Sequence, residues 1–220
     1  MVFCLTKNKF QILVVFIVIF AIIFSFYIYP LLPETMPVHW NMAGEVDRYG
    51  SAVESAFLFP IIMVFILALF YMIPKIAVFK ENLKAFENKY WQFVVGIELF
   101  FFAFFVLTVV PIFGFDINMV VFLQLLIGVL FIFIGFLMPF FRRNFFAGIR
   151  TPWTLASDEV WKKTHEIGGK AFIVSGLILL VSVFFSEYFV FFLFVSIVLI
   201  LVMTIGYSFY VFKKINEFDL

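Results

Sequence analysis

The sequence predicts an all-α integral membrane protein with six transmembrane helices, cytoplasmic N- and C-termini, one compact extracytoplasmic loop and one structured cytoplasmic loop. Two observations predict this class. Hydrophobic residues make up 65% of the 220 positions and charged residues 13%, whereas soluble domains average about 45–50% and about 25%. Uncharged apolar runs of about 20 residues, the length that crosses a bilayer core, also recur along the chain.

Four apolar runs are clearly delimited, and they cover residues 10–29, 56–73, 91–113 and 117–138. The first is followed by Pro30 and not by a small-residue cleavage site, so we expect an uncleaved span and no signal peptide. The alternating polarity that an outer-membrane barrel needs is missing from these runs. They therefore favour helices.

The last apolar run, 171–212, contains a single charge, Glu187. As one straight helix it would be about 63 Å long, roughly twice the thickness of the hydrocarbon core. We therefore expect the chain to fold back at 186–188, which gives a fifth span over 171–186 and a sixth over 188–212.

The basic residues orient these six spans. Fourteen of the 15 Lys and Arg residues fall on one side of the arrangement, and Arg48 alone falls on the other. Because basic residues accumulate in cytoplasmic loops, both termini are expected in the cytoplasm and the protein in the plasma membrane. The fourteen are Lys7, Lys9, Lys75, Lys80, Lys84, Lys89, Arg142, Arg143, Arg150, Lys162, Lys163, Lys170, Lys213 and Lys214.

The outer loop, 31–55, is predicted to be a small ordered cap. Its prolines exclude a helix, 38–40 is expected to be extended, and 41–44 and 47–50 are each expected to form a turn. Its four acidic residues would attract a basic peptide, although solvated charges on a cap explain them equally well. The candidate partner-binding residues are Pro37, His39, Trp40, Asn41, Gly44, Asp47 and Gly50.

The inner loop, 140–170, is predicted to contain a short helix that Ser157 caps and Gly168-Gly169 ends. Its arginines obey the positive-inside rule and suit contact with anionic lipid. Its ordered mixture of Gly, Pro and Trp indicates a defined surface, which serves either a partner or the anchoring of the helix bundle. The candidate partner-binding residues are Arg143, Asn144, Gly148, Arg150, Thr151, Pro152, Trp153, Trp161 and His165.

Two of the polar side chains inside the predicted spans, Glu98 and Gln124, are candidates for a function. Glu98 is costly to place in lipid and is therefore a functional candidate. It is either a protonated or hydrogen-bonded side chain that joins helices, with Gln124 as a partner, or part of a proton or ion path. The second reading gives an alternative function, a small membrane transporter or ion conduit that uses Glu98 and Gln124.

Enzyme chemistry is not indicated. His39 and His165 fall on opposite sides of the membrane and cannot share a metal ion, and neither loop supplies the ligands that zinc requires. The common hydrolase, zinc-protease and phosphate-loop motifs are missing. Cys4 is the single cysteine, which excludes an intrachain disulfide. We expect no catalytic residues, metal or cofactor, and the net charge of +1 argues against direct nucleic-acid binding.

Both loops resemble known family motifs. The pattern Pro33-x3-Pro37-x-His39-Trp40-Asn41-x2-Gly44-x2-Asp47-x2-Gly50-Ser51 resembles the extracytoplasmic motif of the family of unknown function DUF1648. Such motifs often continue with a lysine, where this chain has Ala52. The pattern Arg143-Asn144-x3-Gly148-Ile149-Arg150-Thr151-Pro152-Trp153-Thr154, followed by Trp161-x2-Thr164-His165-x2-Gly168-Gly169-Lys170, resembles the signature of the SdpI family.

The resemblance implies a DUF1648-like region over 1–74 and an SdpI-like region over 75–220. It further implies a membrane protein with two functional faces. The outer face would sense, and confer immunity to, an extracellular peptide toxin. The inner face would capture a cytoplasmic transcriptional repressor at the lipid bilayer. A scaffold without any ligand remains a further alternative.

Overall fold

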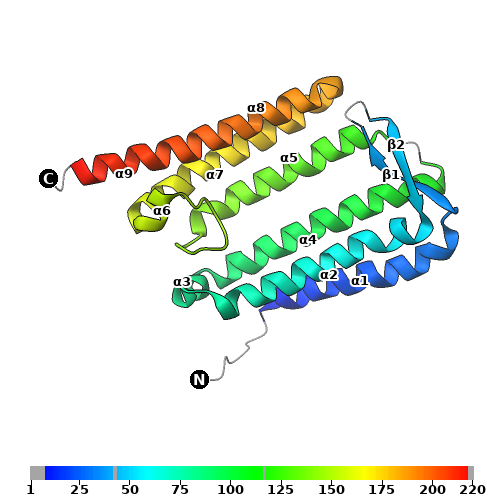
Figure 1. Ribbon diagram of the computed structural model, residues 1–220, viewed down its shortest axis with the longest axis horizontal. Helices are drawn as coiled ribbons and strands as arrows, with labels where there is room; N and C mark the ends of the chain where they lie inside the picture. The colour runs from blue at the N-terminus through cyan, green and yellow to red at the C-terminus, as the bar shows by residue number, and fades with distance from the viewer. Residues whose placement is uncertain (1–7, 42–43, 116, 218–220) are drawn as a thin grey trace.

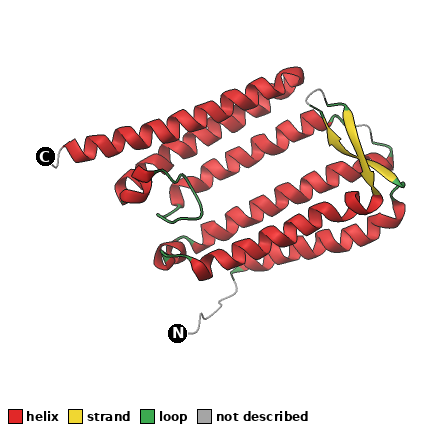
Figure 2. Ribbon diagram, viewed as in Figure 1, coloured by secondary structure: helices red, strands yellow, loops and turns green. Residues whose placement is uncertain are grey.

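The computed structural model describes residues 8–41, 44–115 and 117–217. Cys4 and Lys7 lie outside these residues. Helices dominate the described chain, and one two-stranded sheet crosses an end of the helix bundle (Figures 1 and 2).

The elements follow one another in this order: α1 (Lys9–Ile28), a 3₁₀ turn η1 (Tyr29–Leu31), β1 (Thr35–Trp40), β2 (Val46–Ser51), α2 (Ala52–Ile76), α3 (Lys80–Ala85), α4 (Glu87–Val109), η2 (Val110–Phe113), α5 (Met119–Leu137), η3 (Met138–Phe140), α6 (Pro152–Ala156), α7 (Asp158–Val181), η4 (Ser182–Tyr188), α8 (Phe189–Leu201), a π-helical segment η5 (Val202–Gly206) and α9 (Tyr207–Glu217).

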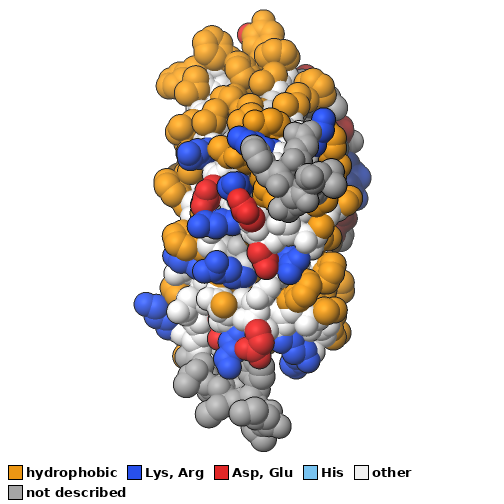
Figure 3. All heavy atoms as spheres, turned by 90° about the vertical axis from the view of Figure 1, so that its left-hand side faces the viewer, with side chains coloured by type: hydrophobic (Ala, Val, Ile, Leu, Met, Phe, Trp, Pro, Cys, Tyr) orange, Lys and Arg blue, Asp and Glu red, His pale blue; other side chains and the backbone are white. Residues whose placement is uncertain are grey.

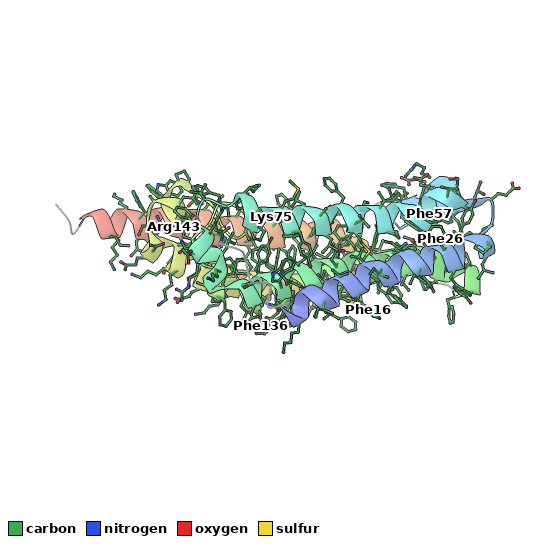
Figure 4. All side chains as sticks on the ribbon, turned by 90° about the horizontal axis from the view of Figure 1, so that it is seen from below. Phe16, Phe26, Phe57, Lys75, Phe136 and Arg143 are labelled. Carbon is green, nitrogen blue, oxygen red and sulfur yellow. The ribbon has the colours of Figure 1, made fainter. Side chains whose placement is uncertain are left out.

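Five helical runs of the described chain are long and apolar enough to cross a membrane. These are Lys9–Leu31, Ala52–Ile76, Glu87–Phe113, Met119–Phe140 and Asp158–Ile215. Large apolar side chains cover their outer surfaces: Phe16 and Phe136 point away from the bundle (Figure 4), and Phe16, Phe26 and Phe136 are more than 60% exposed. Such exposure is expected where helices face lipid and not water.

The last of these runs is broken near its middle. Phe185 has a non-helical backbone conformation, and α7 and α8 lie side by side as an antiparallel pair (Figure 1). Two serines join them reciprocally, since Ser175 Oγ donates to the Ser196 carbonyl at 3.1 Å and Ser196 Oγ donates to the Ser175 carbonyl at 3.4 Å. The chain thus turns back within one residue of the predicted segment 186–188.

The helices form two groups. In one, Ser25 Oγ of α1 donates to the Ala56 carbonyl of α2 at 2.7 Å, and Tyr90 Oη of α4 donates to the Phe70 carbonyl of α2 at 2.7 Å. The other contains α5, α7, α8 and α9, and α4 packs against α5 between the groups (Figure 1). We call them the α1–α2–α4 group and the α5–α9 group.

Helix α7 continues through Gly168-Gly169, so the prediction that these glycines end a helix was wrong. A Cβ on Gly169 would lie 2.7 Å from the Gly135 carbonyl of α5, and one on Gly176 would lie 2.5 Å from the Gly128 carbonyl. The glycines recur at seven-residue spacing and let two antiparallel backbones meet closely, as small residues do in membrane helices. This contact outweighs the local tendency of glycine to end a helix.

The outer loop is an antiparallel hairpin of β1 and β2. The predicted turn over 41–44 is confirmed in part: Gly44 has φ +84° and its N–H donates to the Asn41 carbonyl at 2.9 Å, while 42–43 lie outside the described residues. The predicted turn over 47–50 was wrong, because these residues belong to β2 and Tyr49 pairs with Pro37 of β1. Cross-strand pairing overrode their turn-forming composition.

Candidate functional site

The inner loop is organised around Asn144, which is 1% exposed. Its Oδ1 accepts hydrogen bonds from the N–H groups of Phe146 at 2.8 Å and Ala147 at 2.7 Å. Its Nδ2 donates to the carbonyls of Arg142 at 2.8 Å and Ala147 at 3.0 Å. One side-chain amide therefore satisfies four backbone groups of a segment that has no regular structure, as buried backbone requires.

Arg143 ties this loop to the start of α7. Its Nη1 donates to the Leu155 carbonyl at 2.9 Å, and its Nε lies 2.8 Å from Asp158 Oδ1 in an ion pair. The guanidinium also lies over the Phe79 ring, with 5.3 Å between Cζ and the ring centroid. Asn82 Nδ2 of α3 donates to the Arg143 carbonyl at 2.8 Å. Arg143 thus joins the loop to α6 and α7 and to the segment between α2 and α4.

Trp161 and His165 lie one turn apart on α7, as their spacing predicted, and both are buried. The Trp161 indole N–H donates to the Phe141 carbonyl at 2.8 Å. His165 Nδ1 lies 2.8 Å from the Trp161 carbonyl, and the Ile149 N–H donates to His165 Nε2 at 3.0 Å. These partners require a neutral imidazole with its proton on Nδ1, because one partner is an acceptor and the other a donor.

A third set of contacts attaches helix α6 to α9. Thr151 caps α6, and Thr154 Oγ1 donates to the Ile149 carbonyl at 2.8 Å. Thr151 Oγ1 also bonds Ser208 Oγ of α9 at 3.1 Å. Trp153 packs on Phe209, with 5.1 Å between ring centroids. The loop is thereby held at both ends and along the C-terminal helix.

The predicted inner-face residues therefore fall into two classes. Asn144, Thr151, Trp161 and His165 are buried and use their polar atoms inside the molecule. A protein that approached this face would contact the more accessible positions, which are Arg143, Gly148, Arg150, Pro152 and Trp153. Their role in binding a partner stays a prediction.

Sequence reasoning missed several contributors to this loop. Thr154 completes a capping box with Thr151, and the three-residue spacing of the two threonines is a signal that could have been used. Asn82 and Ser208 are distant in sequence, and nothing local marks them as partners of the loop.

The outer hairpin carries its polar residues in bonded pairs. His39 Nδ1 lies 2.5 Å from Asp47 Oδ1 across the strands, and both side chains are exposed. Asn41 Nδ2 donates to Glu45 Oε2 at 3.0 Å. A Cβ on Gly44 would lie 2.9 Å from Val120 Cγ2, which places the end of the hairpin against the start of α5.

The remaining predicted outer residues occupy defined places in the same hairpin. Pro37 pairs with Tyr49, and Trp40 pairs with Val46. Gly50 lies in β2, where a Cβ would overlap the Glu54 carboxylate. The outer loop is therefore an ordered platform that exposes His39 and Asp47. Whether it contacts a toxin stays a prediction.

The predicted pair of Glu98 and Gln124 is not formed within the described residues. Gln124 Nε2 donates instead to Ser182 Oγ at 3.1 Å and to the Ser182 carbonyl at 3.2 Å. Glu98 is fully buried, and neither of its carboxyl oxygens has a hydrogen-bond partner in the part of the chain that the structure describes.

The depth of the two side chains explains the missing pair. A Cβ on Gly96 of α4 would overlap the Phe133 ring of α5, so these two positions lie at one level. With the helices antiparallel, Glu98 and Gln124 are then separated by roughly 10 Å along the bundle axis at 1.5 Å per residue. A conduit that needs the two side chains in contact loses its structural basis.

Metal chemistry gains no support from the described residues, among which no cluster of three or more His, Cys, Asp or Glu side chains could hold an ion.

Comparison with known proteins finds a similar family for the region around each loop. Residues 141–208 match the SdpI/YfhL protein family, and residues 16–64 match DUF1648, a domain of unknown function. The chain is 28% identical over 211 residues to the immunity protein SdpI of Bacillus subtilis (strain 168). The aligned region covers 94% of this chain and 98% of that protein. No solved structure matches. The chain is thus a multi-pass membrane protein with one region similar to DUF1648 and one similar to the SdpI/YfhL protein family, as its two loop motifs implied.

Proposed function

We propose that this protein protects the cell that makes it against a secreted peptide toxin and acts at the plasma membrane without catalysing a reaction. The observation that carries the proposal is the 28% identity to an immunity protein, which extends across 94% of the chain and therefore includes both loops. The ordered conformations of both loops support it, since a defined surface is what recognition of a partner requires.

We infer six membrane crossings with both termini in the cytoplasm. The run Asp158–Ile215 folds back at Phe185 and so supplies two crossings. The start of α1 and the end of α9 lie at one end of the bundle (Figure 1), where Lys and Arg side chains gather (Figure 3). Arg48 lies on the hairpin at the other end, and the positive-inside rule then places the hairpin outside. In this topology, the DUF1648-like region 1–74 and the SdpI-like region 75–220 meet in the last turn of α2.

The outer hairpin is the surface that we assign to toxin recognition. Glu34, Glu45 and Asp47 are exposed there, whereas Arg48 is paired with Glu54 at 3.0 Å. The balance of charge is therefore acidic, which favours the approach of a cationic peptide.

A competition experiment tests immunity. Deletion and parent strains are mixed and exposed to stationary-phase supernatant of the parent strain, and surviving cells of each are counted. We expect the deletion strain to lose viability first and a plasmid copy of the gene to restore it. Equal survival of the two strains, in supernatant that kills an unrelated sensitive strain, would remove the proposal.

Charge variants test whether the acidic residues of the outer hairpin contribute more to survival than other acidic residues at the same end of the bundle. Neutralising Glu34 and Asp47 together (E34Q/D47N) is expected to reduce survival, because it removes half of the four acidic charges of the loop. The matched control is E187Q, since Glu187 lies in the η4 turn at the same end of the bundle but outside the hairpin. Equal effects of the two variants at equal protein levels would contradict recognition by the hairpin.

Capture of a repressor is proposed for the inner face, where Arg150 is exposed and bonded only to the Phe145 carbonyl among the described residues. Transcripts are measured in wild-type, R150Q and K80Q cells before and after exposure to the toxin. We expect wild-type and K80Q cells to induce a set of genes and R150Q cells to lose that induction while surviving normally. If wild-type cells induce nothing, repressor capture is excluded.

A further inference from the structure

A cleft of about 830 Å³ opens between the two helix groups at the end where α4 and α7 begin. Its walls come from the α3–α4 junction, from the segment after α5 and from the first turn of α7. The cationic side chains that line it are Lys84, Lys89, Arg142, Arg143 and Lys162. We call it the basic cleft.

The positive charge of the basic cleft is largely uncompensated. Its acidic lining residues are Glu87 and Asp158, and Asp158 is already paired with Arg143 at 2.8 Å. Within the described chain, Lys84, Arg142 and Lys162 have no ion-pair partner. Such an excess of cations in a concave site favours an anion.

The start of α4 adds to this field. No side chain caps α4, whose N-cap residue Phe86 lines the cleft. Four other helices, α1, α2, α5 and α7, are capped by the side chains of Asn8, Ser51, Asn118 and Ser157, whereas α8 also lacks a side-chain cap. The positive dipole end of α4, which no side chain caps, therefore reinforces the five cationic side chains.

An apolar surface adjoins the cations. Phe140 lines the cleft and is 52% exposed, and Lys89 Nζ lies 4.5 Å from the centroid of its ring. One turn earlier, Phe136 is 62% exposed and projects away from the bundle (Figure 4). A small free anion would make no contact with this apolar surface, whereas the acyl chains of a lipid would pack on it.

We propose that the basic cleft binds the phosphate headgroup of an anionic phospholipid from the cytoplasmic leaflet. Lys84, Arg142 and Lys162 hold the phosphate, and the acyl chains extend past Phe140 toward Phe136. The position of the cleft at the inner ends of α4 and α5 places the phosphate at headgroup depth, where anionic lipids attract basic residues. This lipid site does not depend on toxin recognition or on the capture of a repressor.

The full chain, purified in detergent, tests the proposal by thermal unfolding. We expect dioleoyl phosphatidylglycerol to raise Tm by at least about 3 °C more than phosphatidylcholine does. The variant K84Q/R142Q/K162Q is expected to lose at least two thirds of that difference. The matched control K75Q/K80Q/K170Q removes as many inner-side charges outside the cleft and is expected to keep it. If the triple cleft variant does not fold, K84Q alone, which alters an exposed side chain, replaces it.

Three outcomes would overturn the proposal. An equal loss in the cleft and control variants would show general attraction to anionic lipid and no built site. Sodium phosphate that gives the same Tm rise as phosphatidylglycerol would show a site for free phosphate. A hexaglutamate peptide that abolishes the lipid effect at an equal concentration would assign the cleft to an acidic protein segment.

Discussion

The imidazole of His165 lies almost flat on the indole of Trp161, with 4.1 Å between ring centroids and 18° between ring planes. Both rings also bond backbone groups of the inner loop: Trp161 bonds the Phe141 carbonyl and His165 bonds the Ile149 N–H. This pair therefore holds the inner loop at two points, Phe141 and Ile149. The inner signature thus acts first as a structural clamp, on which any recognition surface depends.

Replacing His165 by Ala is expected to lower the free energy of unfolding by about 1–3 kcal/mol, because the Ile149 N–H loses its buried acceptor. H165Q offers an amide oxygen near the Nε2 position and is expected to recover part of this loss. Thermal unfolding in detergent measures both. The control H39A alters an exposed pair and should cost less than about 1 kcal/mol. A loss in H39A as large as in H165A would contradict the clamp.

Gly148→Ala combines backbone strain with a clash. Gly148 has φ +106°, and a Cβ there would overlap His165 Nε2. Gly114 also has a positive φ of +84°, but a Cβ on it meets nothing within 4 Å. G114A therefore measures the strain alone, about 1 kcal/mol, and G148A should cost clearly more in the same thermal assay. Equal losses would show that His165 moves aside freely.

The contact of Gly169 with Gly135 predicts a strong effect of a single methyl group. G169A brings a Cβ within 2.7 Å of the Gly135 carbonyl and is expected to cost about 1–3 kcal/mol through forced separation of α5 and α7. G206A is the matched control, since a Cβ there meets nothing within 4 Å. The two variants are compared by the fraction of each protein that stays monodisperse after heating. A G169A variant as heat-stable as G206A would disprove the close packing.

The same glycines show where sequence reasoning succeeds and fails. Apolar runs and basic residues predicted the helices and their common basic end, because both follow from the physics of the bilayer. Gly168-Gly169 was misread as a helix end, since the carbonyl of Gly135 that explains it lies on another helix. Likewise, 47–50 has the composition of a turn, and only its pairing with β1 reveals a strand.

The candidate site divides in a similar way. The four-residue spacing of Trp161 and His165 was enough to place them on one face of α7. Their partners Phe141 and Ile149 lie 20 and 16 residues earlier in the chain, in a segment without regular structure, so helical periodicity cannot predict them. The depth of Glu98 relative to Gln124 depends on how α4 packs on α5, and this packing cannot be predicted from the composition of the two helices.

Glu98 is a buried carboxyl group whose two oxygens have no described hydrogen-bond partner. Replacing it by Met removes an unsatisfied polar group from an apolar setting, so E98M is expected to raise stability by about 1–3 kcal/mol. The survival assay is run on the same variant. A more stable protein that no longer protects cells would show that Glu98 is kept for function, whereas a less stable one would contradict its lack of partners.

The bond between Gln124 and Ser182 ties the start of α5 to the end of α7 and is best measured by a double-mutant cycle. Q124A, S182A and the double variant are expected to show a coupling of about 0.6–1.7 kcal/mol, the range for hydrogen bonds between membrane helices. The companion cycle combines Q124A with E98A. Because these side chains lie at different depths, their effects should add within about 0.5 kcal/mol. Coupling between Glu98 and Gln124 larger than that between Gln124 and Ser182 would contradict the depth assigned to Glu98 and would restore the pair that a conduit needs.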